Sequence, residues 1–351
     1  LLTGSMTAKQ KRRAYEALEV YSNAMIIGTH ALIQEKAIYQ NLALVITDEQ
    51  HRFGVRQRET FAGKGTEPHV LVMSATPIPR TLAIIIYGDL DISVIDEVPA
   101  KRLPIKNCVV DRRYRPKAYA FIEHEIRAGH QAYVICPLVE ESENMEAENV
   151  TDYAKRLREE LPEDIVIGVL HGQMKAEQKN KIMDQFVKNE IQVLVSTTVV
   201  EVGVNVPNAT VMVIENAERY GLSALHQLRG RVGRGSVSGT CLVMTHSKGN
   251  GGASAAQDRL QSLEKTSDGF ALAQMDLRLR HEGEILGYRQ HGGVTLRFVD
   301  LDADEDLIEW AHLDAVELLR YACNLDSVAT RPLRDAVAMR YRHIFKEVSG
   351  G

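Results

Sequence analysis

Two adjacent acidic residues, Asp48 and Glu49, follow an apolar run at residues 42–46. A run of bulky apolar residues of this length predicts a strand that is buried on both faces. In open α/β sheets, ligands bind at the carboxyl ends of the strands. An aspartate at that point suits Mg²⁺ held jointly with substrate phosphates, and a neighbouring glutamate can activate a water molecule. The alternative is a solvated acidic turn, which is commoner for a lone Asp-Glu pair.

A second segment, MSATPIPRTLA at residues 73–83, follows the same order of strand, polar turn and helix. Its hydroxyl residues Ser74 and Thr76 would lie beside the acidic pair if the two strands are neighbours in one sheet. The alternative is an ordinary strand-to-helix turn capped by threonine.

A third segment, QLRGRVGRG at residues 227–235, carries Arg231 and Arg234 three positions apart. This spacing predicts that both side chains lie on one helical face. Two guanidinium groups presented in this way match a triphosphate, whereas the alternative is a basic surface helix. In addition, Thr197 and Thr198 follow a predicted strand, where hydroxyl groups bind phosphates of DNA or nucleotide.

The elements that must position these residues alternate along the chain as short apolar runs and amphipathic stretches, which is the α/β pattern. We predict strands at residues 24–27, 42–46, 70–73, 132–136, 165–170, 193–196, 211–214 and 241–244. Residues 96–106 contain two prolines without periodicity and predict a linker, and residues 247–255 are glycine-rich. The predicted domains are therefore 1–98, 99–252 and a mostly helical region at 253–351.

The composition excludes several classes of protein. The 351 residues have a formal net charge of −5, so phosphate contacts must come from local clusters of Lys and Arg. Cys108, Cys136, Cys241 and Cys323 are far apart and indicate reduced thiols rather than a disulfide or zinc framework. Without a membrane-spanning run or a signal-peptide pattern, we expect a soluble, cytoplasmic protein.

Seven motifs, in order, resemble those of superfamily 2 DNA helicases, and within these the RecG family. They are GTHALIQ (28–34), DEQHRFG (48–54), SATPIPRTLA (74–83), CPLVEES (136–142), LHGQMK (170–175), TTVVEVGVNVPNA (197–209) and HQLRGRVGRG (226–235). The resemblance implies two RecA-like helicase lobes, the first incomplete at its N-terminus, followed by a helical-hairpin translocation motif. It also implies an ATP- and Mg²⁺-dependent helicase, a monomer that remodels stalled replication forks and Holliday junctions in DNA repair and recombination. Branched DNA is the implied partner, and a single-stranded DNA-binding protein is a further candidate.

The resemblance also implies roles for individual residues. Asp48, as metal ligand, and Glu49 would be the Walker B acids, with Gln50 and His51 linking the ATP state to DNA contacts. The nucleotide would further meet Gln227, Arg231, Arg234, Gly203 and Asn205. The residues implied for DNA contact or coupling are Thr29, Ser74, Thr76, Thr197, Thr198, Arg259, Arg280 and Gln290. Two departures from the family pattern are Asn205, where the family usually has Asp, and His281-Glu282-Gly283, where it favours Gly-Pro-Gly.

The sequence contains no G-x-x-x-x-G-K-[ST] motif, so it lacks the loop that cradles the β- and γ-phosphates. The chain also begins with Leu1. We therefore expect the C-terminal portion of a longer protein, without the wedge domain and without ATP turnover of its own. The alternatives are the motor of a transcription-repair coupling factor and a non-catalytic DNA-binding fragment.

Overall fold

The computed structural model describes residues 1–4, 6–48, 64, 68–87, 90–97, 103–137, 143–197, 204–245, 255–279, 299–301, 303–322 and 324–340. The chain forms two compact units. The described residues of the first unit lie within Leu1–Ala75, and those of the second lie within Thr76–Ile285 and Leu296–Gly351. The predicted domain limits at residues 98 and 252 stay a prediction.

The first unit contains a helix and a two-stranded parallel sheet. Helix α1 (Ala8–Val20) begins with a capping box, in which Thr7 and Gln10 each accept a hydrogen bond from the other's backbone amide. Strands β1 (Leu44–Thr47) and β2 (His69–Val72) are hydrogen-bonded neighbours. The small apolar core of this unit is formed by Leu2, Leu18, Ala31 and Ala37.

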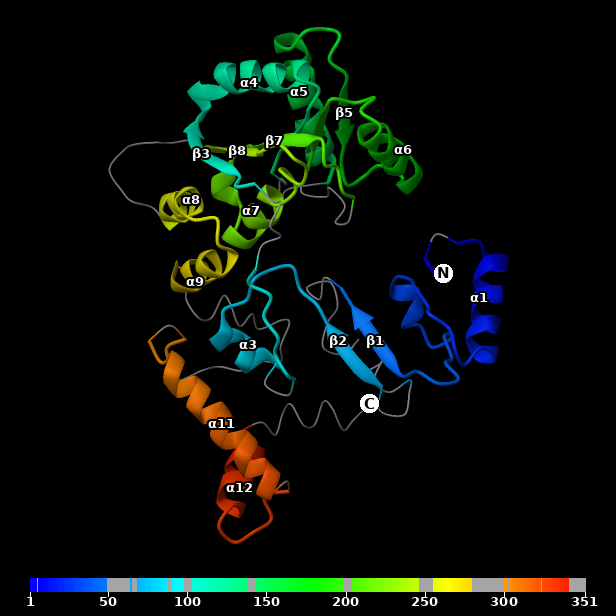
Figure 1. Cartoon of the computed structure of the whole chain (residues 1–351), viewed down its shortest axis with the longest axis vertical. Coiled ribbons are helices and arrows are strands. Elements are labelled where there is room, and N and C mark those ends of the chain that lie inside the picture. The colour runs from blue at the N-terminus through cyan, green and yellow to red at the C-terminus, as the bar shows by residue number, and fades with distance from the viewer. Residues whose placement is uncertain are drawn as a thin grey trace. The chain divides into compact units, whose positions relative to one another are not determined.

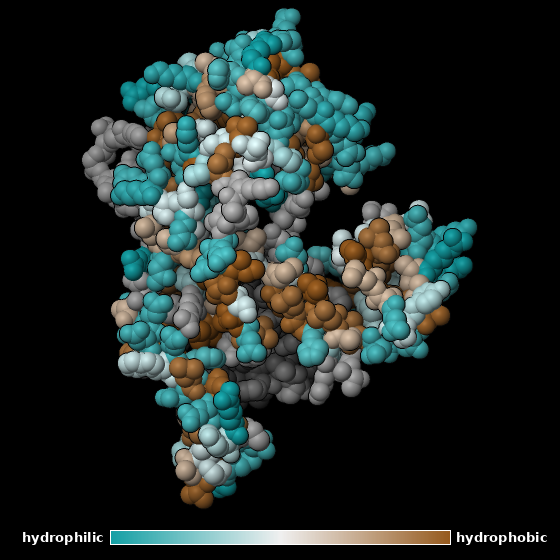
Figure 2. Space-filling view, viewed as in Figure 1, coloured by the Kyte–Doolittle hydropathy of each residue, from teal (hydrophilic) through white to brown (hydrophobic). Residues whose placement is uncertain are grey.

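One face of this two-stranded sheet is apolar and exposed. Leu44, Ile46 and Leu71 lie on it, and each is about half exposed. Figure 2 shows apolar side chains gathered over β1 and β2. The prediction of a strand from this apolar run is confirmed. Parallel strands are normally buried on both faces, whereas only one face of β1 is covered in this unit.

The second unit is built on a six-stranded, all-parallel sheet in the order β3-β8-β7-β4-β6-β5. Its strands are β3 (Lys106–Asp111), β4 (Gln131–Ile135), β5 (Ile167–Leu170), β6 (Val193–Ser196), β7 (Ala209–Ile214) and β8 (Thr240–Thr245). The central strands β4, β6 and β7 are buried at every position. This explains why their sequences are nearly continuous apolar runs rather than alternating ones.

Helices cover both faces of this sheet, and each face has its own apolar core. The covering helices are α4 (Arg115–Arg127), α5 (Glu143–Glu160), α6 (Ala176–Val187), α7 (Leu222–Arg229), α8 (Ala255–Lys265) and α9 (Gly269–Leu279). Helix α3 (Arg80–Tyr87) also belongs to the second unit. Helices α4 and α5 bury residues such as Ile122 and Leu157 against one face. Helices α6 to α9 bury Phe186, Leu225 and Leu263 against the other. Figure 1 shows α4 and α5 on one side of the sheet and α7 on the opposite side.

The structure confirms seven of the eight predicted strands and corrects the eighth. Residues 24–27 do not form a strand; the described chain there makes only an isolated bridge between Leu2 and Gly28. A side chain at Gly28 would place its Cβ 2.1 Å from the carbonyl oxygen of Leu2, so the backbones meet at a point where only glycine fits. Conversely, β3 was missed because Lys106, Asn107 and Asp111 interrupt its apolar residues at the edge of the sheet.

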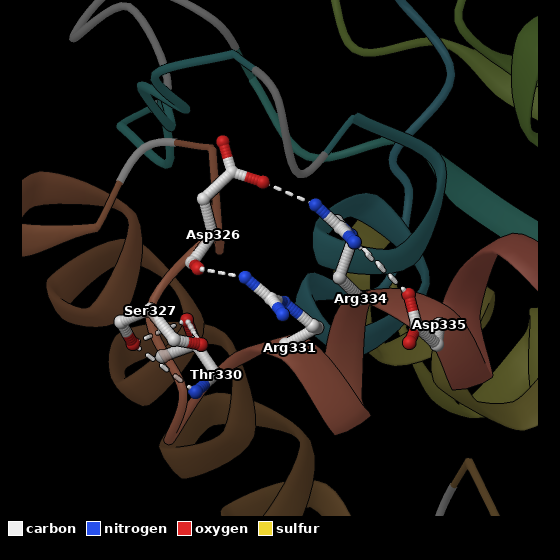
Figure 3. A network of polar contacts seen from close by, with 6 residues as sticks. All are labelled: Asp326, Ser327, Thr330, Arg331, Arg334 and Asp335. Carbon is white, nitrogen blue, oxygen red and sulfur yellow. Dashed lines mark hydrogen bonds and ion pairs between the residues drawn. The ribbon is translucent and has the colours of Figure 1, made fainter.

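The last described segment of the second unit consists of α11 (Glu305–Tyr321) and α12 (Arg331–Arg340). Polar contacts fix the turn between them: Arg331 donates to the backbone carbonyl of Asp326, and Arg334 forms an ion pair with the Asp326 carboxylate. Figure 3 shows these side chains pointing toward one another at the start of α12. No helix in the described part of the chain is long and apolar enough to cross a membrane.

Candidate functional site

The first unit brings Asp48 and Ser74 to the same edge of its sheet. β1 ends at Thr47 and β2 at Val72, which are partners in the parallel register. The Met73 amide donates to the Thr47 carbonyl at 2.8 Å, so the pairing continues to the last residues before Asp48 and Ser74. The condition under which the serine would lie beside the acid, that the two strands are neighbours, is thus confirmed. Asp48 and Ser74 are both exposed, and Thr29 is an exposed residue of the same unit.

In the second unit, α7 brings Gln227 to Thr76. The Gln227 amide nitrogen Nε2 donates to the Thr76 hydroxyl at 2.6 Å, between residues 151 positions apart. Both side chains are half-buried. Two predicted site residues from separate motifs therefore make direct contact.

The prediction that Arg231 and Arg234 share a helical face is wrong. Helix α7 ends at Arg229, and the two arginines lie in the turn that follows it. Gly233 has a φ of +67°, and a Cβ there would lie 3.0 Å from the amide nitrogen of Gly239, so the backbone cannot continue as a helix.

The turn nevertheless places both guanidinium groups within electrostatic range of one phenol, that of Tyr133. Burial raises the pKa of Tyr133 to about 12, and Arg231 and Arg234 both oppose that rise. Both positive charges therefore act on the same phenol. Arg231 is half-buried, whereas Arg234 is exposed and donates from Nε to the Gly230 carbonyl at 2.9 Å. The pair can present positive charge to an anion without a helical scaffold.

Thr197 follows β6 at the carboxyl edge of the sheet, as predicted, but its side chain is fully buried. Its hydroxyl has no hydrogen-bond partner among the described residues. A buried hydroxyl without a partner is destabilising, which makes it a candidate for a bond to a ligand. Asn205 is exposed.

The other predicted residues divide into two groups. Arg259 lies in α8, half-buried, and its Nε is buried without a hydrogen-bond partner in the described chain. The predicted residues that lie outside the described ones are Glu49, Gln50, His51, Thr198, Gly203, Arg280 and Gln290.

Sequence reasoning missed a buried polar cluster at the carboxyl end of β7. Glu215 accepts two hydrogen bonds from Arg115, at 2.6 and 3.1 Å, and a third from the Tyr153 hydroxyl at 2.8 Å. Its carboxylate is almost fully buried, so these donors replace water. Arg115 and Tyr153 lie 100 and 62 residues from Glu215 in sequence, so no local sequence pattern indicates the cluster.

Comparison with known proteins identifies the family. Residues 117–236 match the model of the helicase conserved C-terminal domain. A Synechocystis protein named ATP-dependent DNA helicase RecG is 45% identical over 344 residues, which cover 98% of this chain. A Bacillus subtilis protein of the same name is 45% identical over 91% of this chain. The chain belongs to the RecG family.

Solved structures agree with that membership. A RecG bound to a three-way DNA junction matches with a TM-score of 0.65 and 40% identity, covering 88% of this chain and 39% of that one. The Mycobacterium smegmatis helicase Lhr matches 76% of this chain and 36% of its own with a TM-score of 0.53 at 15% identity, which supports the fold alone. The fold is therefore that of RecA-like helicase lobes. The chain spans 41% and 46% of the lengths of the Synechocystis and Bacillus RecG relatives.

Proposed function

We propose that this chain is the motor region of an ATP-dependent DNA translocase of RecG type, which remodels branched DNA such as stalled forks and Holliday junctions. The observation that carries the proposal is the 45% identity to a named RecG helicase over 98% of the chain. Branched DNA as the substrate is supported by the 40% identical RecG that was solved on a three-way junction.

This function assigns separate roles to the predicted regions and residues. We propose residues 1–98 and 99–252 as the two helicase lobes and 253–351 as a helical translocation region. Asp48 would hold Mg²⁺, and Glu49 would orient and deprotonate the attacking water. Arg231 and Arg234 would neutralise charge on the phosphates, while Gln227 would report the nucleotide state to Thr76. Arg259, Arg280 and Gln290 would couple that state to DNA.

The residues of this chain fit ATP and Mg²⁺ only in part. Bound ATP supplies a phosphoryl group for transfer to water, and Mg²⁺ in such sites is shared between one or two carboxylates and the phosphates. Asp48 and the two arginines suit these ions, but no Gly-rich phosphate loop with its lysine occurs in the 351 residues. We therefore assign no hydrolysis to this chain alone, and for the isolated chain the DNA-binding fragment without turnover is the favoured alternative.

A fusion of this chain with the amino-terminal segment of a relative tests the proposal. The chain would be joined to the amino-terminal segment of the Bacillus subtilis relative, which precedes the matched region. Phosphate release should be stimulated by a synthetic fork in the joined protein and should be absent from the 351-residue chain. Glu49→Gln in the joined protein is the control; losing a water-activating base costs on the order of 10²–10⁴-fold in rate. Stimulated release by the unjoined chain, or none by the joined protein, contradicts the proposal.

A further inference from the structure

Three basic residues come from neighbouring elements of the second unit. Arg112 lies in the 3-10 helix η3 (Arg112–Tyr114), which directly follows β3, and Lys117 lies in the first turn of α4. Arg156 lies in α5, and its side chain is exposed. None of the three forms an ion pair with an acidic side chain in the described part of the chain. We call these three residues the basic corner.

Electrostatic and ring contacts show that these charges converge with that of Arg115. Burial lowers the pKa of Arg112, and the positive charges of Arg115 and Arg156 lower it further. The guanidinium carbons of Arg115 and Arg156 lie 6.0 and 5.7 Å from the centroid of one ring, that of Tyr153. Lys117 is two residues after Arg115 on the same helix. Like charges this close repel one another, so the arrangement is costly unless an anion joins it.

The acids of this region leave the charge largely uncompensated. Two carboxylates attract Arg112, those of Glu215 and Glu218. Glu215 accepts two hydrogen bonds from Arg115, however, so its charge is already balanced. Other acids of the adjacent segments are paired with basic residues outside the basic corner: Asp111 with Arg113, and Asp152 with Lys155. Of the two carboxylates that attract Arg112, only that of Glu218 is left against three cations.

Arg112 also carries a donor that the protein does not use. Its Nη2 donates to Oδ1 of Asn216 at 2.6 Å, but its Nε is buried and has no hydrogen-bond partner among the described residues. A buried donor without a partner is destabilising. An oxyanion bound beside this guanidinium would supply the missing acceptor, as well as the missing negative charge.

The basic residues further oppose the dipole of α4. Arg115 and Lys117 occupy its first turn, which contains no acidic residue. The N-terminus of a helix carries partial positive charge and therefore favours acidic side chains over basic ones. Sequences break such local rules mainly at functional sites, where another gain compensates. A bound anion is a gain that offsets both the helix dipole and the repulsion among the side chains.

We propose that the basic corner binds a phosphate group at a site separate from Arg231 and Arg234. Those two arginines act on Tyr133, which is buried in the core on the α6–α9 side of the sheet. Tyr153, the ring beside Arg156, is buried in the core on the α4–α5 side, which Figure 1 shows opposite α7. The site therefore goes beyond the nucleotide-binding role proposed above and does not depend on it.

An exposed aromatic ring indicates the source of the phosphate. Tyr114, at the end of η3, is 39% exposed, and Nζ of Lys117 lies 5.6 Å from the centroid of its ring. Exposed rings beside basic side chains are typical of surfaces that bind single-stranded nucleic acid, since a base stacks on the ring while cations hold the backbone. We therefore expect a backbone phosphate of a single strand. A free polyphosphate shares the same chemistry and is the alternative source.

The first experiment measures binding of a labelled oligothymidylate to the 351-residue chain by fluorescence anisotropy at several salt concentrations. Arg156→Gln should weaken binding several-fold and make the slope of log K against log salt shallower by about 0.7, the value for one phosphate contact. Arg112→Gln should act in the same direction. Because Arg156 is exposed, its variant keeps the test decisive if the Arg112 variant does not fold. Arg127→Gln is the matched control, since it removes one half-exposed positive charge at the other end of α4 and should leave the slope unchanged.

The second experiment separates the two sources of phosphate. Tyr114→Ala should weaken oligothymidylate binding by about 10-fold, because a base loses its stacking partner. Tripolyphosphate, titrated by calorimetry, should bind equally to Arg156→Gln and Arg127→Gln if the site is kept for a nucleic-acid backbone. Loss of tripolyphosphate binding in Arg156→Gln alone, with oligothymidylate binding unchanged, would confirm the phosphate site and assign it to a free polyphosphate. If Arg156→Gln binds both probes as Arg127→Gln does, the basic corner is not a phosphate site and the proposal is overturned.

Discussion

Gln227 and Thr76 are 151 residues apart in sequence, yet the Gln227 amide donates a 2.6 Å hydrogen bond to the Thr76 hydroxyl. The contact joins α7 to the segment that precedes α3, within the second unit. Both side chains are half-buried, so if one is removed, water can replace the lost hydrogen bond of the other only in part.

This contact can be measured by a double-mutant cycle. Thr76→Val and Gln227→Met should each lower the free energy of unfolding of the 351-residue chain by about 1 kcal/mol. The double variant should cost less than the sum of the two, since the second change removes a group that has already lost its partner. Urea denaturation followed by circular dichroism gives the three values. Strict additivity would show that the two side chains do not interact in solution.

The buried carboxylate of Glu215 gives a prediction about stability. Arg115→Met should destabilise the second unit by about 3 kcal/mol, because in the described chain it leaves the buried Glu215 carboxylate with only the Tyr153 hydroxyl as a side-chain donor. This loss lies at the low end of the range for breaking a buried ion pair, because the Arg115 side chain is a quarter exposed.

The ion pair of Arg127 with Asp164 is the matched control, since both side chains are at least half exposed. Arg127→Met should leave the urea midpoint unchanged, because exposed pairs contribute little. Equal losses in the two variants would mean that the Glu215 cluster is not the buried site described above.

Buried thiols give a prediction about pH. Burial raises the pKa of both Cys136 and Cys241 to about 12, from an ordinary value of 9.0. Both thiols stay protonated in the folded chain while they ionise in the unfolded chain, so the stability they contribute below pH 9 is lost as pH rises toward 12. In a Cys323→Ser background, a thiol reagent at pH 8 should modify half-buried Cys108 first and the other two only on unfolding. Rapid modification of all three in the native state would contradict the burial.

The sequence was informative where the signal is local. Buried central strands such as β4 and β7 are nearly continuous apolar runs, so their positions could be predicted. The ordered motifs likewise selected Gln227 and Thr76, which the structure brings into contact. The edge strand β3 could not be predicted, because half of its residues are polar and only the pairing with β8 makes it a strand.

Long-range contacts explain the other misses. Arg229 lies inside a recognised motif, but nothing in that motif indicates that it binds carbonyls 37 and 38 residues away. The end of α7 before Arg231 also depends on the approach of Gly233 to Gly239, which is a tertiary contact. The prediction of a shared helical face from spacing alone was therefore wrong, and the site role of Arg231 and Arg234 stays a prediction.

Two buried threonines at equivalent depth allow the DNA role of Thr197 to be tested. Thr197 and Thr210 are both almost fully buried, but only the Thr210 hydroxyl has a partner in the described chain, the Glu125 carboxylate at 2.7 Å. Thr210→Val should lower the free energy of unfolding by about 1–3 kcal/mol, because it leaves that carboxylate without its donor. Thr197→Val keeps the shape of the side chain and replaces a hydroxyl that has no partner in the described chain, so it should be neutral or stabilising.

DNA binding should show the opposite order. If DNA binding makes the buried Thr197 hydroxyl accessible to a phosphate, Thr197→Val should weaken the affinity of the 351-residue chain for a synthetic fork several-fold. Thr210→Val should leave that affinity unchanged. Fluorescence anisotropy at two salt concentrations measures both, since affinity that depends on phosphate contacts falls as salt rises. A Thr197→Val variant that is more stable and binds the fork as tightly as the unmodified chain would remove Thr197 from the DNA site. In that case the unpaired hydroxyl would be a defect in packing rather than a contact held for a ligand.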